Sequence, residues 1–285
     1  MDYRNCTLCP RQCGVDRTSG KTGFCGCPDV ALVAKTMLHK WEEPVLAGSG
    51  GSGAIFFGGC TLGCKYCQNR AISTCPVGKE MDSKALRAEM ENLIAQGAEN
   101  IDLVTPTHFL PTIIPALSPK LSVPVVYNCG GYERTETIRM LSGLVDIYLP
   151  DMKYGDNALA SQLSGASNYV ETALSALREM VNQTGKVTFR GEKMVRGVIV
   201  RHLILPGQVE NSLKVLDLLG ENFSTDEILV SLMRQYTPMG GLPAPYDRQI
   251  TEEEYDAVLS WMYLNGLEGF TQEEASATEA FIPNF

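Results

Sequence analysis

The sequence predicts an α/β fold in which short parallel strands alternate with helices. Between residues 53 and 250, brief apolar segments typical of buried strands are separated by segments whose apolar residues recur at helical spacing. The strand segments are almost continuously apolar, as in parallel sheets that helices cover. A chain of 285 residues is long enough to build such a core as one barrel-sized domain. A partial (β/α) barrel and an open doubly wound sheet both fit this pattern.

Six strand–helix units are predicted. The strands are expected at 54–57, 101–104, 123–127, 145–149, 197–205 and 227–232. The helices are expected at 82–96, 111–117, 135–141, 156–184 and 209–219, followed by a last helix that opens with the capping box Thr251–Glu254. Because residues 1–49 are rich in Cys, Gly and Pro and end in a Gly/Ser stretch, three regions are predicted: 1–49, 50–250 and a C-terminal helix and tail at 251–285.

The composition excludes several classes of protein. A net charge of −9 argues against nonspecific binding to nucleic acid or anionic membrane. No apolar run approaches the length of a membrane-spanning helix, and the first residues lack the apolar core of a signal peptide. A cytoplasmic location is therefore expected. The 10 cysteines of a long cytosolic chain favour metal binding over a disulfide framework.

Polar residues follow every predicted strand. They include Thr105 and Thr107 after the second strand, Asn128 after the third, and Asp151 and Lys153 after the fourth. The fifth strand carries His202, and the sixth leads to a further group of polar residues, 234–236. Because the active sites of parallel α/β folds form at the C-terminal ends of the strands, these side chains predict one functional rim.

The first strand runs into a loop with three cysteines, Cys60, Cys64 and Cys67. Cysteine thiolates are the usual ligands of a [4Fe-4S] cluster, which needs four. Three thiolates would hold three irons and leave the fourth open to a small molecule. The alternative interpretation is a zinc knot or a group of buried thiols.

The Cys-x3-Cys-x2-Cys spacing, with Tyr66 just before the last cysteine, resembles the radical S-adenosylmethionine (SAM) superfamily. Further segments are similar to a poorly characterised branch that is related to pyruvate formate-lyase activating enzyme: 6–13, 104–109, 148–154, 200–207 and 231–236. The resemblance covers nearly the whole chain, to about residue 265. It implies a partial (β/α)6 barrel of the radical SAM type, with a small Cys-rich N-terminal region, and it implies that SAM chelates the open iron.

The resemblance also implies roles for the rim. Asp151 and Lys153 fit a pair that contacts the ribose and carboxylate of SAM, and Asn128 and His202 fit positions near SAM. A rim salt bridge and a core histidine are the alternatives. The Gly-Gly-Glu sequence that binds the SAM amino group in many family members is missing after the second strand. Thr105, Thr107 or backbone carbonyls would have to replace it.

A second set of cysteines precedes the barrel. Cys6, Cys9, Cys13 and Cys25, with Cys27 nearby, supply four thiolates, enough for a closed zinc site or a second iron–sulfur cluster. Such a site would have a structural or electron-relay role, because it has no open position.

The resemblance implies an oxidoreductase that cleaves SAM and abstracts hydrogen from a substrate, with flavodoxin or ferredoxin as electron donor. A glycyl residue of a partner enzyme is the implied substrate. The alternatives are another peptide or small molecule, and a noncatalytic iron–sulfur or zinc electron carrier.

Overall fold

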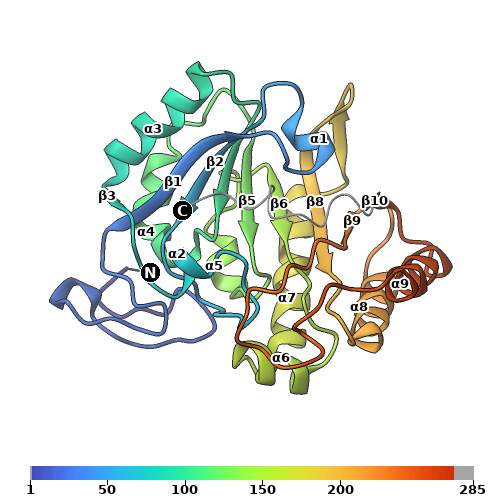
Figure 1. Cartoon of the computed structure of the whole chain (residues 1–285). Coiled ribbons are helices and arrows are strands. Elements are labelled where there is room, and N and C mark those ends of the chain that lie inside the picture. The colour runs from blue at the N-terminus through green and yellow to red at the C-terminus, as the bar shows by residue number, and fades with distance from the viewer. Residues whose placement is uncertain (1, 273–285) are drawn as a thin grey trace.

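The structure, a computed structural model, describes residues 2–272 and is built on one large sheet (Figure 1). The strand order is β10-β9-β8-β6-β5-β4-β2-β1-β3, with β7 paired to β8 alone. The strands are β1 (Ala31–His39), β2 (Ser52–Phe57), β3 (Lys79–Met81), β4 (Ile101–Val104), β5 (Val125–Cys129), β6 (Ile147–Pro150), β7 (Thr188–Arg190), β8 (Lys193–Leu203), β9 (Ile228–Met233) and β10 (Gly269–Thr271).

The helices alternate with the parallel strands. The α-helices are α1 (Pro44–Ala47), α2 (Arg70–Ser73), α3 (Ser83–Ala95), α4 (Leu110–Ala116), α5 (Thr135–Arg139), α6 (Asn157–Ser164), α7 (Tyr169–Thr184), α8 (Val209–Asn222) and α9 (Glu252–Leu264). Two short 3-10 helices, η1 (Arg17–Ser19) and η2 (Thr107–Phe109), lie in loops.

The six predicted strands are confirmed as β2, β4, β5, β6, β8 and β9, and all neighbours among them pair in parallel. β10 extends the parallel part of the sheet beside β9. Strand β1 was not predicted. It lies within residues 1–49, which were assigned to a separate region because of their Cys, Gly and Pro content, and it pairs antiparallel with β2. The sheet therefore continues across residue 49, and the predicted division there remains a proposal.

The predicted helix at 156–184 is two helices. The Asp156 side chain caps α6 by accepting hydrogen bonds from Ala158 and Leu159, and Gly165 ends the helix in the left-handed conformation (φ 58°). A side chain with a Cβ disfavours that conformation, so glycine at this position favours the break.

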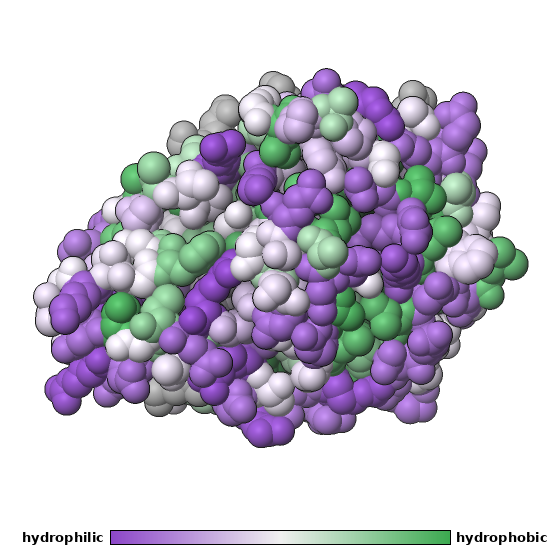
Figure 2. Space-filling view, turned by 90° about the horizontal axis from the view of Figure 1, so that it is seen from below, coloured by the Kyte–Doolittle hydropathy of each residue, from purple (hydrophilic) through white to green (hydrophobic). Residues whose placement is uncertain are grey.

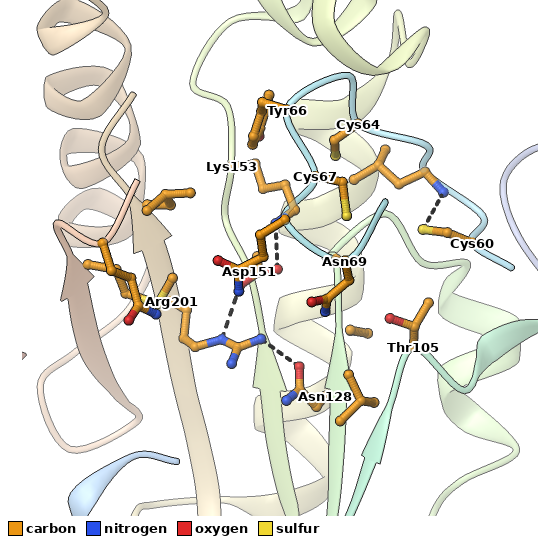
Figure 3. Close-up of a pocket in the computed structure, with 18 of the residues that line it drawn as sticks. Cys60, Cys64, Tyr66, Cys67, Asn69, Thr105, Asn128, Asp151, Lys153 and Arg201 are labelled. Carbon is orange, nitrogen blue, oxygen red and sulfur yellow. Dashed lines mark hydrogen bonds and ion pairs between the residues drawn. The ribbon is translucent and has the colours of Figure 1, made fainter. Parts of the chain in front are cut away.

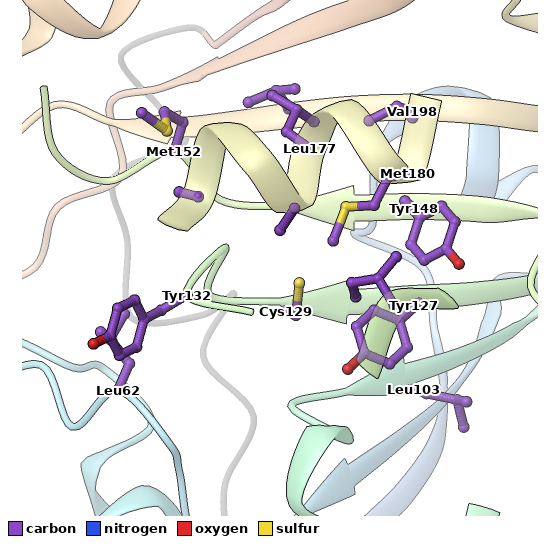
Figure 4. Close-up of a cluster of buried hydrophobic side chains, with 14 of the residues drawn as sticks. Leu62, Leu103, Tyr127, Cys129, Tyr132, Tyr148, Met152, Leu177, Met180 and Val198 are labelled. Atoms are coloured by element: carbon purple, nitrogen blue, oxygen red, sulfur yellow. The ribbon is translucent and has the colours of Figure 1, made fainter. Parts of the chain in front are cut away.

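The helices cover one face of the sheet, which distinguishes the partial barrel from a doubly wound sheet. Leu177 and Met180 of α7 are buried against β6 and β8, where Tyr148 and Val198 point toward them (Figure 4). Truncating Leu177 to Ala would cost about 2–5 kcal/mol in a core of this kind. The other face is the barrel interior, where Val126, together with residues of β6 and β8, packs on short α1.

Alternation along the strands decides which polar side chains enter the barrel. Tyr127 belongs to the core beneath the helices, whereas its neighbours Val126 and Asn128 point the other way. On β8 the same alternation turns Arg201 inward and His202 toward the helices. Apolar residues fill much of the interior, which also holds the buried Asp102 of β4, and further polar residues gather toward the C-terminal ends of the strands.

The N-terminal lobe, defined here as residues 2–30, packs at those strand ends (Figure 1). Arg17 is buried and donates hydrogen bonds from Nε to the Pro28 carbonyl oxygen (2.9 Å) and from Nη1 to that of His108 (2.6 Å). Seen from this end, the molecule is mostly hydrophilic, with small hydrophobic patches (Figure 2). Within residues 2–272, no helix has both the length and the apolar character needed to span a bilayer.

Candidate active site

A cavity of about 170 Å³ lies at the C-terminal ends of the parallel strands (Figure 3). It brings together eight of the predicted site residues: Cys60, Cys64, Tyr66, Cys67, Thr105, Asn128, Asp151 and Lys153. These come from the cysteine loop and from the ends of β4, β5 and β6, segments far apart in the sequence. The predicted functional rim therefore exists as one concave site.

The cysteine loop is held tightly against the N-terminal lobe. Gly59 has φ +79°, and a Cβ there would lie 2.2 Å from Sγ of Cys27, so no other residue fits without displacing the lobe. Each cysteine sulfur accepts a hydrogen bond: Cys60 from Leu62 N (3.4 Å), Cys64 from Ser164 Oγ (3.1 Å) and Cys67 from Ser73 Oγ (3.5 Å). Donors directed at sulfur are typical of metal-bound thiolates.

The donor set fits a [4Fe-4S] cluster. Burial and the neighbouring Cys64 and Cys67 raise the pKa of the Cys60 thiol to about 12, so bringing three thiolates together here requires cationic compensation. The thiol of Cys129 is turned away: it hydrogen-bonds the Glu133 carboxyl in the core. Cys60, Cys64 and Cys67 thus supply three ligands, and the remaining volume adjoins them.

Within residues 2–272, no three His, Cys, Asp or Glu side chains are arranged to hold a single metal ion. An iron–sulfur cube binds each thiolate at a different iron and so spreads its ligands more widely than a zinc ion does. The three thiols of the loop are consistent with the ligands of a cluster.

Opposite the cysteines, a chain of polar contacts crosses the strand ends (Figure 3). Asp151 Oδ2 accepts from Lys153 Nζ (2.6 Å), and Asp151 Oδ1 accepts from Arg201 Nε (3.1 Å). Arg201 Nη2 in turn donates to Asn128 Oδ1 (2.5 Å). Although burial opposes ionisation of Asp151, the charges of Lys153 and Arg201 hold its pKa below the ordinary value. The result is a buried, ionised pair at the floor of the site.

A tyrosine fixes the backbone that carries this pair. The Tyr169 hydroxyl accepts a hydrogen bond from Lys153 N (2.9 Å) and lies 3.0 Å from the carbonyl oxygens of Gly130 and Asp151. Tyr169 is fully buried. The loops after β5 and β6 are thus tied together, which limits the movement of Asp151 and Lys153.

Thr105 and Thr107, the two threonines expected to replace Gly-Gly-Glu, follow β4. The φ of Thr105, +59°, is unusual for a residue with a branched side chain, and its backbone N donates to the Asn128 carbonyl oxygen (2.8 Å). Thr105 lines the cavity, whereas Thr107 does not. Thr107 is buried behind the strand end, where its hydroxyl donates to Glu133 Oε1 (2.8 Å). Of the two threonines, only Thr105 lines the cavity.

The expectation that His202 lies near SAM is not supported. His202 is fully buried on the helix side of β8, with Nδ1 2.7 Å from the Met152 carbonyl oxygen and Nε2 2.8 Å from Ser212 Oγ. Its neighbour Arg201 lines the cavity instead, because successive residues of a strand point to opposite faces. The sequence showed the alternation but not which face was the interior. Gln235, from the predicted polar group after the sixth strand, also lines the cavity, as does Asn69, which the sequence reasoning missed.

The cysteines of the N-terminal lobe lie in a different setting. Cys6 packs with Tyr3 and Leu8 in a small apolar cluster. Cys9 is buried and Cys13 exposed. A hydrogen bond from Cys27 lowers the pKa of the Cys25 thiol. Whether Cys6, Cys9, Cys13 and Cys25 bind a metal is untested and stays a prediction.

Comparison with known proteins agrees with this site. The family model described as "4Fe-4S single cluster domain" matches residues 46–108, which contain the cysteine loop. A radical SAM methyltransferase from Sphaerobacter thermophilus shares the fold with a TM-score of 0.54 and 14% identity over 78% of this chain and 66% of its own. SuiB from Streptococcus suis, solved with S-adenosylmethionine, has a TM-score of 0.50 and 12% identity over 75% of this chain.

The match spans less than two thirds of either solved chain, with 48% of SuiB covered. The chain thus shares the fold of these radical SAM enzymes, and its cysteine loop lies inside the matched cluster domain. An uncharacterized protein, MJ0674 from Methanocaldococcus jannaschii, is 30% identical over 90% of this chain and 74% of its own length. The chain belongs to the same family as MJ0674.

Proposed function

We propose that the protein is a radical SAM enzyme that abstracts hydrogen from an organic substrate. The observation that carries this proposal is the meeting of Cys60, Cys64 and Cys67 with the Asp151–Lys153 pair in one cavity. A noncatalytic electron carrier would need the cysteines but not a preformed polar pocket beside them.

A reduced [4Fe-4S] cluster supplies an electron that cleaves SAM to methionine and a 5′-deoxyadenosyl radical. The protein's part is to bind, orient and shield. Lys153 presents positive charge toward a carboxylate, and Asp151 and Asn128 offer acceptors to ribose hydroxyls. Thr105 offers its hydroxyl and carbonyl to the amino group in place of an acidic residue.

The proposed substrate is a glycyl residue of a partner enzyme, as the resemblance to activating enzymes implies, and the proposed reductant is flavodoxin or ferredoxin. Another peptide or a small molecule is the second substrate class. Both classes use the same cleavage of SAM, which can be tested before the substrate is known.

The test is anaerobic reconstitution with iron and sulfide, reduction, addition of SAM and measurement of 5′-deoxyadenosine. We expect the wild-type protein to form it and Cys60→Ala to form none. The matched control is Cys75→Ala, because Cys75 is an exposed cysteine outside the cavity. If an intact cluster in the wild-type protein yields no 5′-deoxyadenosine, the enzymatic proposal is wrong.

A further inference from the structure

A second, larger cavity of about 530 Å³ adjoins the first. The two cavities share Arg201, Met233 and Gln235, so the second begins where the first ends. Its outer wall is formed by residues 40–43, which join β1 to α1, and by α1 with Gly48 after it. Its far side is formed by β10 and Gln272. It lies farther from the cysteine loop, because none of the three cluster cysteines lines it. A substrate that must reach the SAM site has room here.

The charges along this second cavity are unevenly compensated. Arg201 is shared by two carboxylates, with Nε 3.1 Å from Asp151 Oδ1 and Nη1 3.5 Å from Glu42 Oε1. Glu42 is nearly buried and also lies 3.5 Å from Asn128 Nδ2. Arg201, the cation that the two cavities share, is therefore committed to Asp151 and Glu42.

Glu43 lines the same cavity without such a partner. Among residues 2–272, no ion pair within 4.0 Å reaches its carboxylate, and its polar contact is a hydrogen bond with the Ser231 side chain. Burial, followed by the neighbouring Glu42, raises its pKa to about 7, although the charge of Arg201 opposes the rise. A carboxylate in a partly desolvated chamber with no cation in direct contact gains strongly from a cationic ligand.

The remaining walls suit the same kind of ligand. Trp41 at the rim is 68% exposed, and an indole face attracts ammonium and guanidinium groups. Gln235 and Gln272 add neutral hydrogen-bonding groups, and Phe270 adds an apolar surface for a hydrocarbon stem. Lys40 also lines the cavity, but it is solvent-exposed, so it repels a cation less than a buried lysine would.

We propose that this second cavity is the substrate chamber and that it takes an organic group carrying a primary ammonium or guanidinium, with Glu43 as the anionic anchor. The inference rests on the proposed function, because it assigns the substrate class of the same site. A negatively charged substrate would meet Glu43, which has no ion-pair partner within 4.0 Å in the described part of the chain, and Arg201, which is already paired with two carboxylates. The substrate's hydrogen donor would lie on the carbon chain between the anchored charge and the SAM cavity.

The test measures binding by anaerobic calorimetry on the reconstituted protein with SAM. The probes are N-acetyl-lysine N-methylamide, its neutral norleucine analogue and its anionic glutamate analogue. The titration is run near pH 8, above the raised pKa of Glu43, so that its carboxylate is ionised. We expect the lysine probe to bind most tightly, and Glu43→Gln to weaken that probe alone by at least about tenfold.

Glu80→Gln is the matched control, because Glu80 is an exposed glutamate on β3 outside both cavities. Formation of 5′-deoxyadenosine is followed in every sample. If the neutral or anionic probe binds as well as the lysine probe, or if Glu43→Gln binds like the wild type, the chamber assignment is overturned while SAM cleavage persists. Failure of the proposed function would instead show as absent SAM cleavage in the wild type.

Discussion

The protein carries two groups of cysteines that differ in what surrounds them. Cys60, Cys64 and Cys67 follow a buried strand, accept three directed hydrogen bonds and face a cavity lined by charged residues. The cysteines of the N-terminal lobe lie in a coil-rich segment and line neither the main cavity nor the chamber beside it. Although both groups lie near the strand ends, only the first lines the main cavity.

The two regions are nevertheless mechanically joined. Arg11 of the lobe donates from Nε to the Thr61 carbonyl oxygen (3.1 Å) and from Nη2 to that of Leu62 (3.0 Å), both in the cysteine loop. Its guanidinium also lies over the Phe24 ring, 3.9 Å from the centroid. We propose that the lobe supports the loop that holds the cluster, whatever metal its own cysteines bind.

The sharpest contrast between the cysteine groups is expected in activity. Replacing Cys64 with Ala removes one of three cluster ligands and should lower 5′-deoxyadenosine formation by more than about 100-fold, beyond the loss seen for supporting residues. Cys9→Ala should retain activity if the lobe is structural. Iron and zinc analysis of a Cys60/Cys64/Cys67 triple Ala variant identifies what the lobe binds. Equal loss of activity in both single variants would contradict the contrast.

The next largest effect is expected where the two regions touch. Gly59→Ala places a Cβ 2.2 Å from Cys27 Sγ and also forces Ala into φ +79°. The conformational cost is about 1–2 kcal/mol, and overpacking adds roughly 1–3 kcal/mol. Gly143→Ala is the matched control, because its φ is +77° and no atom lies within 4 Å of the added Cβ. Denaturant unfolding of both variants measures the difference. Equal destabilisation would show that the N-terminal lobe shifts to accommodate the added Cβ without a cost in stability.

A loss of stability at low pH should report on a neighbouring contact, the one between His108 and Gly58. Burial lowers the pKa of His108 to about 4, and Nε2 of its neutral ring lies 2.8 Å from the Gly58 carbonyl oxygen, just before the cysteine loop. Because the unfolded chain binds this proton near its ordinary pKa, stability is complete above about pH 6.5 and declines toward pH 4, by on the order of 3 kcal/mol. His108→Gln should flatten this decline in urea unfolding measured from about pH 7.5 downward.

His202, whose pKa burial likewise lowers to about 4, provides the comparison within the barrel. Its protonation should destabilise the protein over the same pH window, since both histidines are neutral in the folded state. His202→Gln should therefore remove a separate, additive part of the slope. A double variant that retains the full pH dependence would show that neither histidine is responsible.

The smallest effect is expected from Arg11. Arg11→Gln removes guanidinium hydrogen bonds to four carbonyl oxygens, those of Thr61, Leu62, Ser164 and Gly165. Because these carbonyls are part-buried or exposed and can bind water instead, the net cost should be roughly 1–3 kcal/mol. The cluster potential should fall as well, because a positive charge near the loop favours the reduced cluster. Arg4→Gln, at an exposed position in the same lobe, is the control. If Arg11→Gln changes neither the reduction potential of the cluster nor the stability of the protein, the proposal that the lobe supports the cluster loop is wrong.

The sequence by itself determined the α/β class, the six parallel strands and the cysteine loop at the end of the first of them. It could do so because these features are local: apolar runs define strands, helical spacing defines helices, and three thiols within a short loop share one place. It also identified Asp151, Lys153 and Asn128, since the end of any parallel strand reaches the same rim.

Tertiary structure decided what depends on orientation and on distant segments. Arg201 and His202 are adjacent in sequence, and only the curvature of the sheet made the face of Arg201 the interior. Thr105 and Thr107 were separated in the same way by the turn after β4. Glu43 gained its importance from β9 and β10 across the chamber. These properties arise from packing between remote elements, which no local pattern specifies.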